Sequence, residues 1–330
     1  MKLDEAINHH LEKLAALGSN DERLLTIEGR RHRLKVGAIY LEASASQKPI
    51  RQVTSLDGEI PTGDGSVRSR HYYIGGTEPC FSMIYFHGGG WVAGDLGTHD
   101  QLLRHVVDIA GCEIFSVDYA LSPESRQPTA CQQGISVLNY VSERRQRRDP
   151  RIVLGGDSAG AHIAASIANQ THTNIDGMFL LYPVISPKFD TNSHRYMGGT
   201  SSLTTAAMRW FWEQYLGCKM PVDRLDTTNP LIDLTWQKWL HKPPPAVIVS
   251  AWHDPLFDDA PVYAAALKKA GGTVTLRQAM DMNHGFARFL GVSDAAYRHV
   301  RDAINDLKEV IAVHDACTEN VPFPSERGRN

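Results

Sequence analysis

The 330-residue sequence has few cysteines, almost no net charge and no long hydrophobic run. Its five cysteines are scattered and odd in number, which makes a reducing cytoplasm the simplest location. Neither Cys-x-x-Cys nor His-Glu-x-x-His occurs, so no zinc site is expected. No segment approaches the roughly 20 apolar residues that a membrane-spanning helix requires.

The chain also lacks an extended basic tract and an apolar signal core at its N-terminus. The one basic run, residues 144–148, ends a predicted helix. Such a run is typical of a solvated helix end favoured by the dipole rather than of a nucleic-acid patch. We therefore expect a cytoplasmic protein with neither nucleic acid nor a membrane as partner. The oligomeric state is left open.

What the chain does contain is a serine between two glycines, Gly-Asp-Ser-Ala-Gly at residues 156–160. An apolar run before it predicts a buried strand, and the Ala/Ile-rich segment after it predicts a helix. This is the nucleophile-elbow pattern, in which glycine permits a turn too tight for side chains. The pattern predicts that Ser158 lies at the apex with its hydroxyl exposed.

A phosphate-binding loop is the alternative for this stretch. Residues 155–160 match the first half of that motif, but Ala161 and His162 stand where Lys and Ser/Thr are needed. The serine interpretation is therefore preferred.

A second glycine-rich loop, His-Gly-Gly-Gly at residues 87–90, follows an apolar strand. Ester hydrolysis passes through an oxyanion that needs preorganised donors, and bare glycine amides leave room for the ester. The predicted oxyanion hole consists of the amides of Gly88, Gly89 and Ala159. A dinucleotide loop is disfavoured, because residues 91–95 do not resemble a helix start.

The remaining groups lie near the C-terminus. Asp254 follows a β-branched run, and His284 follows a second predicted strand. The order Ser158, Asp254, His284 is that of α/β-hydrolases. A serine hydroxyl needs an adjacent base, so His284 is the predicted base and Asp254 the group that orients it.

Nearby titratable residues receive structural roles instead. His253 is expected in a loop, Asp258 and Asp259 at a helix start, and His162 in packing or at the surface. Asp157 is expected to point away from the serine hydroxyl and to form supporting hydrogen bonds.

With these motifs in place, the chain resembles the hormone-sensitive-lipase-like α/β-hydrolase esterases, and within them bacterial acetyl esterases. The matching segments lie at residues 87–90, 118–124, 156–160, 254–259 and 284–286. The resemblance implies supporting roles for His87, Gly90, Asp157, Asp118 and Glu124, with 118–124 as a brace beneath the oxyanion loop. Departures at Ala120, Ser122 and Gln127 concern packing and leave the chemistry unchanged.

The expected fold is α/β, with a mostly parallel sheet, helices on both faces and a helical cap. Strands are expected near residues 50–60, 67–75, 82–86, 112–117, 151–155, 177–182, 246–251 and 273–279, with a turn at 61–65. Helices are expected near 3–17, 21–44, 98–110, 127–147, 158–170, 258–271 and 293–314. The predicted divisions are an N-terminal part of the cap (1–45), the core (46–183 and 243–314), a cap insertion (184–242) and a disordered tail (315–330).

The cap insertion is rich in aromatic residues, and most of these are expected to form its own core. Trp210 and Trp212 from the cap, and Trp91 and Phe286 from below, are the predicted substrate contacts. The resemblance implies a pocket suited to short acyl chains.

The sequence thus predicts a carboxylic ester hydrolase that cleaves short-acyl esters through an acyl-enzyme on Ser158, without a cofactor or a metal. Two alternatives stay open: a ligand receptor on a hydrolase scaffold, and another acyl-transfer enzyme such as a peptidase or an acyltransferase.

Overall fold

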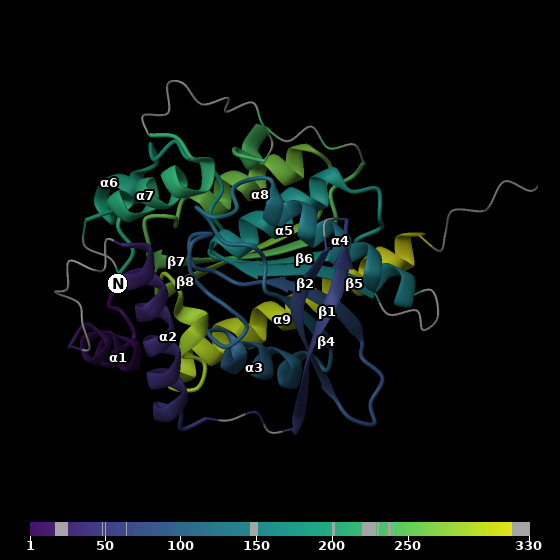
Figure 1. The fold of residues 1–330 in the computed structure, drawn as a ribbon, viewed down its shortest axis with the longest axis horizontal. Coiled ribbons are helices and arrows are strands. Elements are labelled where there is room, and N and C mark those ends of the chain that lie inside the picture. Colours follow the sequence, from purple (N-terminus) through teal and green to yellow (C-terminus); the bar gives the residue numbers. More distant parts are fainter. Residues whose placement is uncertain are drawn as a thin grey trace, which may run out of the picture.

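A central eight-stranded sheet organises the protein in the computed structural model, which describes residues 1–16, 26–47, 49, 51–63, 65–145, 151–199, 202–219, 229, 231–236, 239 and 241–318 (Figure 1). The strand order is β1-β2-β4-β3-β5-β6-β7-β8. Strand β2 is antiparallel to both neighbours, and the strands from β4 to β8 pair in parallel. The strands are β1 (Val53–Thr62), β2 (Gly65–Ile74), β3 (Phe81–Phe86), β4 (Glu113–Val117), β5 (Arg151–Asp157), β6 (Gly177–Leu181), β7 (Ala246–His253) and β8 (Val274–Asn283).

Helices cover both faces of this sheet, which confirms the predicted fold class. Two hydrophobic clusters separate across the sheet: one contains residues of α4, α5 and α8, the other residues of α3 and α9. The helices are α1 (Glu5–Ala16), α2 (Ile27–Ser44), α3 (Asp100–Ala110), α4 (Thr129–Arg145), α5 (Ala159–Gln170), α6 (Asn192–Tyr196), α7 (Thr205–Leu216), α8 (Asp259–Lys269) and α9 (Asp294–Thr318), with 3₁₀ turns η3 (Leu234–Trp236) and η4 (Phe286–Phe289).

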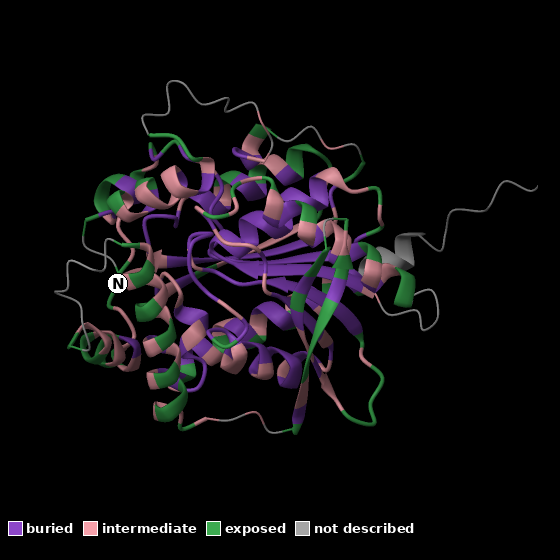
Figure 2. Cartoon of the chain, in the orientation of Figure 1, coloured by how far each residue is buried: buried purple, intermediate pink, exposed green. Residues whose placement is uncertain are grey.

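The central strands read as continuous apolar runs because both of their faces are covered. All six residues of β3 and all five of β6 are buried. The hairpin of β1 and β2 at the sheet edge is far more exposed, as Figure 2 shows in green.

Some predicted boundaries were wrong. The turn expected at residues 61–65 is shorter, because Pro61 and Thr62 end β1 and Gly65 begins β2. Residues 315–318, which were expected in the disordered tail, belong to α9 instead. Residues 319–330, 21–25 of the second helix and 146–148 of the basic run lie outside the described residues.

The parallel strands place the candidate catalytic residues and the glycine loop at one edge of the sheet. Strands β3, β5, β7 and β8 end just before the glycine loop, Ser158, Asp254 and His284 respectively. Carboxyl ends of parallel strands meet at the same edge of a sheet, where α/β proteins bind ligands. Helices α2, α6 and α7 gather beyond one end of the sheet (Figure 1), with Arg30 of α2 against Trp210 of α7.

Candidate active site

Ser158 lies on a strained turn between β5 and α5. Its φ of 54° and ψ of −119° are unusual for a residue with a side chain and are tolerated where the surrounding structure fixes them. The positions on either side need glycine, because a side chain there would collide with neighbouring backbone. An added Cβ on Gly156 would lie 2.4 Å from the carbonyl carbon of Gly160, and one on Gly160 would lie 1.9 Å from the oxygen of Phe86.

The structure brings together the three residues predicted for catalysis. His284 Nε2 lies 2.9 Å from Ser158 Oγ, and His284 Nδ1 lies 2.6 Å from Asp254 Oδ2. Asp254 is fully buried, and its second oxygen accepts the amide of Leu256 at 2.9 Å. The carboxylate is therefore fixed before any substrate binds, and it holds the imidazole toward the serine.

The glycine loop differs from the prediction at its first glycine. The amide of Gly88 donates to Asp157 Oδ1 at 2.9 Å, so it is not available as an oxyanion donor. Within the described chain, the amides of Gly89, Gly90 and Ala159 donate no hydrogen bond. These three amides are the remaining candidates beside the serine.

The loop conformation needs glycine at two of these positions. Gly89 has a φ of 129°, and an added Cβ would lie 2.0 Å from the oxygen of Ala93. Gly90 has a φ of 62°, and its added Cβ would lie 2.2 Å from the ring of Phe211. The second contact also shows that the cap reaches the glycine loop.

Asp157 points away from the serine hydroxyl into a buried network. Besides Gly88, its carboxylate accepts the hydroxyl of Tyr85 at 2.9 Å and lies 3.3 Å from His99 Nε2. Burial alone would raise its pKa, but His99, Tyr85 and Gly88 outweigh this and lower the pKa to about 2. His99, which the sequence analysis did not single out, thus belongs to the support of the site.

The segment at 118–124 contacts the glycine loop from the other side. Tyr119 stacks on His87 and donates its hydroxyl to the His87 carbonyl at 2.7 Å. The fully buried His87 has its pKa lowered to about 4, chiefly by that burial. The carboxylate of Asp118 pairs with Arg68 at 3.3 Å.

Glu124 links helix α2 to the segment at residues 118–124. Its carboxylate accepts two hydrogen bonds from Arg31, at 2.7 and 2.9 Å, and Arg31 Nε also donates to the Val92 carbonyl at 2.8 Å. The N-terminal helix is therefore tied to the loop that carries the candidate oxyanion donors.

Two of the predicted substrate contacts lie inside the packing between cap and core. Trp212 is 0% exposed and its ring lies 4.5 Å from that of Trp91, which stacks on Tyr215 at 4.4 Å. Buried His162 lies edge-on to Trp91 and Trp212. Phe286 is also 0% exposed, against Tyr182. As packed, these rings present no surface to a substrate.

Trp210 and Phe211 are placed differently, because both are only partly buried. The guanidinium carbon of Arg30 lies 4.3 Å from the Trp210 ring centroid and 4.8 Å from that of Phe211. Phe211 was not among the predicted substrate contacts, yet it covers Gly90. The sequence signal was present, three aromatic residues in a row, but it did not indicate which of them faces the loop.

The neighbours of Asp254 also differ in detail from expectation. His253 ends β7 rather than lying in a loop. Asp258 and Asp259 stand at the start of α8 as predicted, but Asp258 accepts the amide of Ser193 at 2.8 Å. Burial raises the pKa of Asp259 well above its ordinary value, which disfavours the charged form of this carboxylate.

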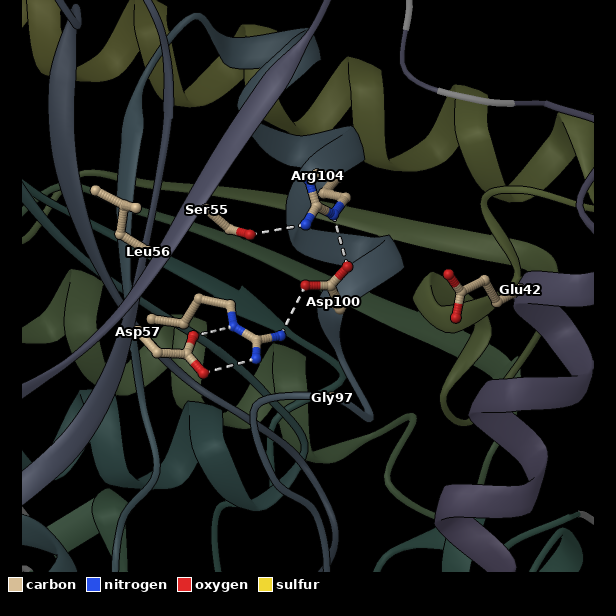
Figure 3. Close-up of a pocket in the computed structure, with 8 residues that line it drawn as sticks. Glu42, Ser55, Leu56, Asp57, Gly97, Asp100 and Arg104 are labelled. Atoms are coloured by element: carbon tan, nitrogen blue, oxygen red, sulfur yellow. Dashed lines mark hydrogen bonds and ion pairs between the residues drawn. The ribbon is translucent and has the colours of Figure 1, made fainter.

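A pocket between the β1–β2 hairpin, α2 and α3 is lined by charged side chains that pair with one another (Figure 3). Arg70 lies 3.0 Å from Asp100, and Arg104 lies 2.6 Å from the same carboxylate. Across the described ranges no three His, Cys, Asp or Glu side chains cluster closely enough to hold a metal ion. No helix in that part of the chain is long and apolar enough to span a membrane.

Comparison with known proteins places this geometry in a family. The alpha/beta hydrolase fold family matches residues 83–288, a span that contains all three candidate catalytic residues. The chain therefore belongs to this family.

Relatives in the family carry esterase names. The carboxylic ester hydrolase LipN of Mycobacterium tuberculosis is 30% identical over 272 residues, 79% of this chain and 71% of that protein. The ethyl acetate hydrolase of Pseudomonas putida is 30% identical over 65% of this chain and 69% of its own length. A thermostable esterase from Pseudomonas putida has a structure with a TM-score of 0.82 and 27% identity, over 94% of this chain and 98% of its own.

Proposed function

We propose that the protein is a carboxylic ester hydrolase that cleaves short-acyl esters through an acyl-enzyme on Ser158. The observation that carries this proposal is the continuous hydrogen-bonded line from Asp254 through His284 to Ser158, at 2.6 and 2.9 Å. The names of the relatives support the reaction class, since they include a carboxylic ester hydrolase and an ethyl acetate hydrolase.

In acylation, neutral His284 carries its proton on Nδ1, toward Asp254, and accepts the Ser158 proton on Nε2. The serine oxygen attacks the ester carbonyl carbon to form a tetrahedral intermediate. The imidazolium then gives its Nε2 proton to the leaving alcohol oxygen, and the acyl group stays on Ser158. Asp254 stabilises the imidazolium and keeps the ring in the productive tautomer.

The amides of Gly89, Gly90 and Ala159 are the proposed donors to the developing oxyanion, in place of the Gly88, Gly89 and Ala159 set. Such donors act on charge that exists only in the transition state, so they lower the barrier rather than merely bind substrate. In deacylation His284 activates water, and the same amides stabilise the second intermediate.

The cap supplies the proposed acyl-length limit. The rings of Trp91 and Trp212 fill the junction between cap and core, and Phe211 covers the glycine loop at Gly90. The cap insertion (184–242), together with the N-terminal helices, is proposed as the unit that encloses the substrate. Trp210 and Phe211 are the proposed cap contacts.

The test is reaction with a serine-directed phosphonate, alongside turnover of an aryl acetate. The wild-type protein is expected to be labelled once, on Ser158, and to hydrolyse the ester. Ser158→Ala should lose both properties while remaining folded, and Ser166→Ala, a buried serine further along α5, should keep both. Absence of labelling and turnover in the wild type would favour a receptor and refute the proposal.

A further inference from the structure

The residue that follows the glycine loop has a backbone conformation that its type rarely adopts. Trp91 has a φ of 60°, next to the 62° of Gly90. A positive φ suits glycine but is an outlier for a bulky side chain, and such strain persists only where the surroundings fix it. The loop that carries the proposed oxyanion donors therefore ends in a residue that needs support from outside the loop.

That support comes from helix α7 of the cap. The Trp91 ring stacks on Tyr215, with centroids 4.4 Å apart and planes at 11°, and its centroid lies 4.5 Å from that of Trp212. Both partners are almost completely buried, and Phe211 of the same helix lies against Gly90. Stacked rings attract one another beyond the apolar area that they bury. One cap helix thus holds two consecutive residues of the strained turn.

The backbone of this turn is held from the core side. The Trp91 carbonyl accepts the amide of Ser122 at 2.8 Å. The Gly89 carbonyl accepts the amide of Ala93 at 3.0 Å. Because Gly90 and Trp91 share a planar peptide group, a change of φ at Trp91 turns that group and moves Gly90 with it. The position of the glycine amides therefore depends on the position of the Trp91 ring.

We infer that Trp91 is a positioning residue for the proposed oxyanion donors, and that the α7 rings of Trp212 and Tyr215 hold it in place. The inference rests on the proposed function and adds to it: the cap encloses the substrate and also preorganises the donors that act on the transition state. Such donors contribute only when they already point at the developing charge. A misplacement of roughly 1 Å lowers the rate by about 10²-fold.

The same rings also pack between cap and core, and packing alone predicts a different result. A variant that only loosens the fold loses active molecules, whereas each folded molecule keeps its kcat. A variant that displaces the donors lowers kcat in every folded molecule and leaves KM unchanged, because the donors act on charge that the bound substrate does not yet carry. Turnover divided by the number of titrated sites therefore separates the two roles.

The experiment compares Tyr215→Met with Tyr215→Phe on an aryl acetate, with phosphonate titration to count active sites. Methionine removes the stacked ring but is flexible enough to fill its space, and phenylalanine keeps the ring. Tyr215→Met should lower kcat per site by about tenfold or more with KM within about twofold, and Tyr215→Phe should stay within about twofold of the wild type in both. Trp212→Met removes the second ring and should lower kcat per site in the same way.

A pair of inhibitors reports on the donors directly. The Ser158 oxygen adds to the carbonyl carbon of phenethyl trifluoromethyl ketone, the serine proton passes to His284, and the carbonyl electron pair becomes an oxyanion. Phenethyl methyl ketone has a similar shape and binds without forming this adduct. Tyr215→Met should weaken inhibition by the fluorinated ketone by about the factor by which kcat falls, and leave inhibition by the methyl ketone within about twofold.

The control is Phe189→Leu, which removes a buried ring of the cap that contacts His194 and Arg209. It should leave kcat per site and both inhibition constants unchanged. If Tyr215→Met and Trp212→Met keep the wild-type kcat per site, or if Phe189→Leu lowers it as much as they do, the inference is overturned while the esterase proposal stands. If no ester turns over in the wild type and Ser158 is not labelled, both fail.

Discussion

The backbone amide of Gly88 donates a hydrogen bond to Asp157 Oδ1 over 2.9 Å, so the residue before the nucleophile holds the first glycine of the oxyanion loop. The loop and the elbow are thereby fixed relative to each other. An added Cβ on Gly88 would lie 2.3 Å from the other oxygen of Asp157, which shows how closely the two segments pack. The donors that face the substrate must then come from the residues that follow.

Asp157→Asn should destabilise the protein in a pH-dependent manner. The pKa of Asp157 is lowered to about 2 in the folded state, against an unfolded value near 3.9, so the ionised carboxylate stabilises the fold above about pH 4. That contribution, roughly 2 kcal/mol, is lost as pH falls toward 2. Urea unfolding of wild type and variant should differ by this amount at pH 7, and the difference should narrow below about pH 4.

Asp118→Asn provides the matched control. Burial raises the pKa of Asp118, so its ionised form is disfavoured in the folded state and its substitution should cost little at pH 7. Equal losses of unfolding free energy in the two variants would contradict the role assigned to Asp157.

Gly89→Ala should reduce kcat by about 10²-fold or more. The residue has a φ of 129°, and the new Cβ would collide with the oxygen of Ala93, so the loop must shift and the amide loses its position. Steady-state kinetics on an aryl acetate, with phosphonate titration to count active sites, measures this effect. Gly58→Ala has open space around the added Cβ and should leave kcat unchanged. Unchanged turnover in Gly89→Ala would exclude its amide as a donor.

Buried His162 should make the protein sensitive to acid. Burial lowers its pKa to about 4, whereas the unfolded chain titrates near 6.5. The unfolded state therefore binds the extra proton first, and stability that is present above about pH 6.5 is lost as pH falls toward 4. For one such group the loss reaches roughly 3 kcal/mol.

The melting temperature of His162→Gln should fall less between pH 7 and 4.5 than that of the wild type. Some acid sensitivity should remain, because burial lowers the pKa of His87 in the same way. A substitution at exposed His32 should leave the slope unchanged. Parallel slopes in wild type and His162→Gln would show that His162 does not contribute.

The sequence predicted the arrangement of Ser158, Asp254 and His284 because all three follow strands, and parallel strands end at one edge. It could not predict that the amide of Gly88 already donates a hydrogen bond within the protein. The acceptor, Asp157, lies 69 residues away in the sequence, and the bond depends on how the two loops pack. Helix α7 poses a similar problem. Periodicity favours one buried face, but only packing against the glycine loop determines that Trp212 turns inward and Phe211 covers Gly90.

Phe211 should set the limit on acyl length, and a series of neutral esters tests this. In the wild type, acetyl to butyryl esters are expected to exceed octanoyl esters in kcat/KM. Phe211→Ala removes the ring that covers Gly90, so longer chains should gain relative to acetyl by about 1–3 kcal/mol per methylene newly accommodated. Trp236→Ala, at an exposed position in η3, should leave the ratio unchanged. If octanoyl esters are the better substrates of the wild type, the short-acyl proposal fails, whereas the roles of Ser158 and His284 do not depend on it.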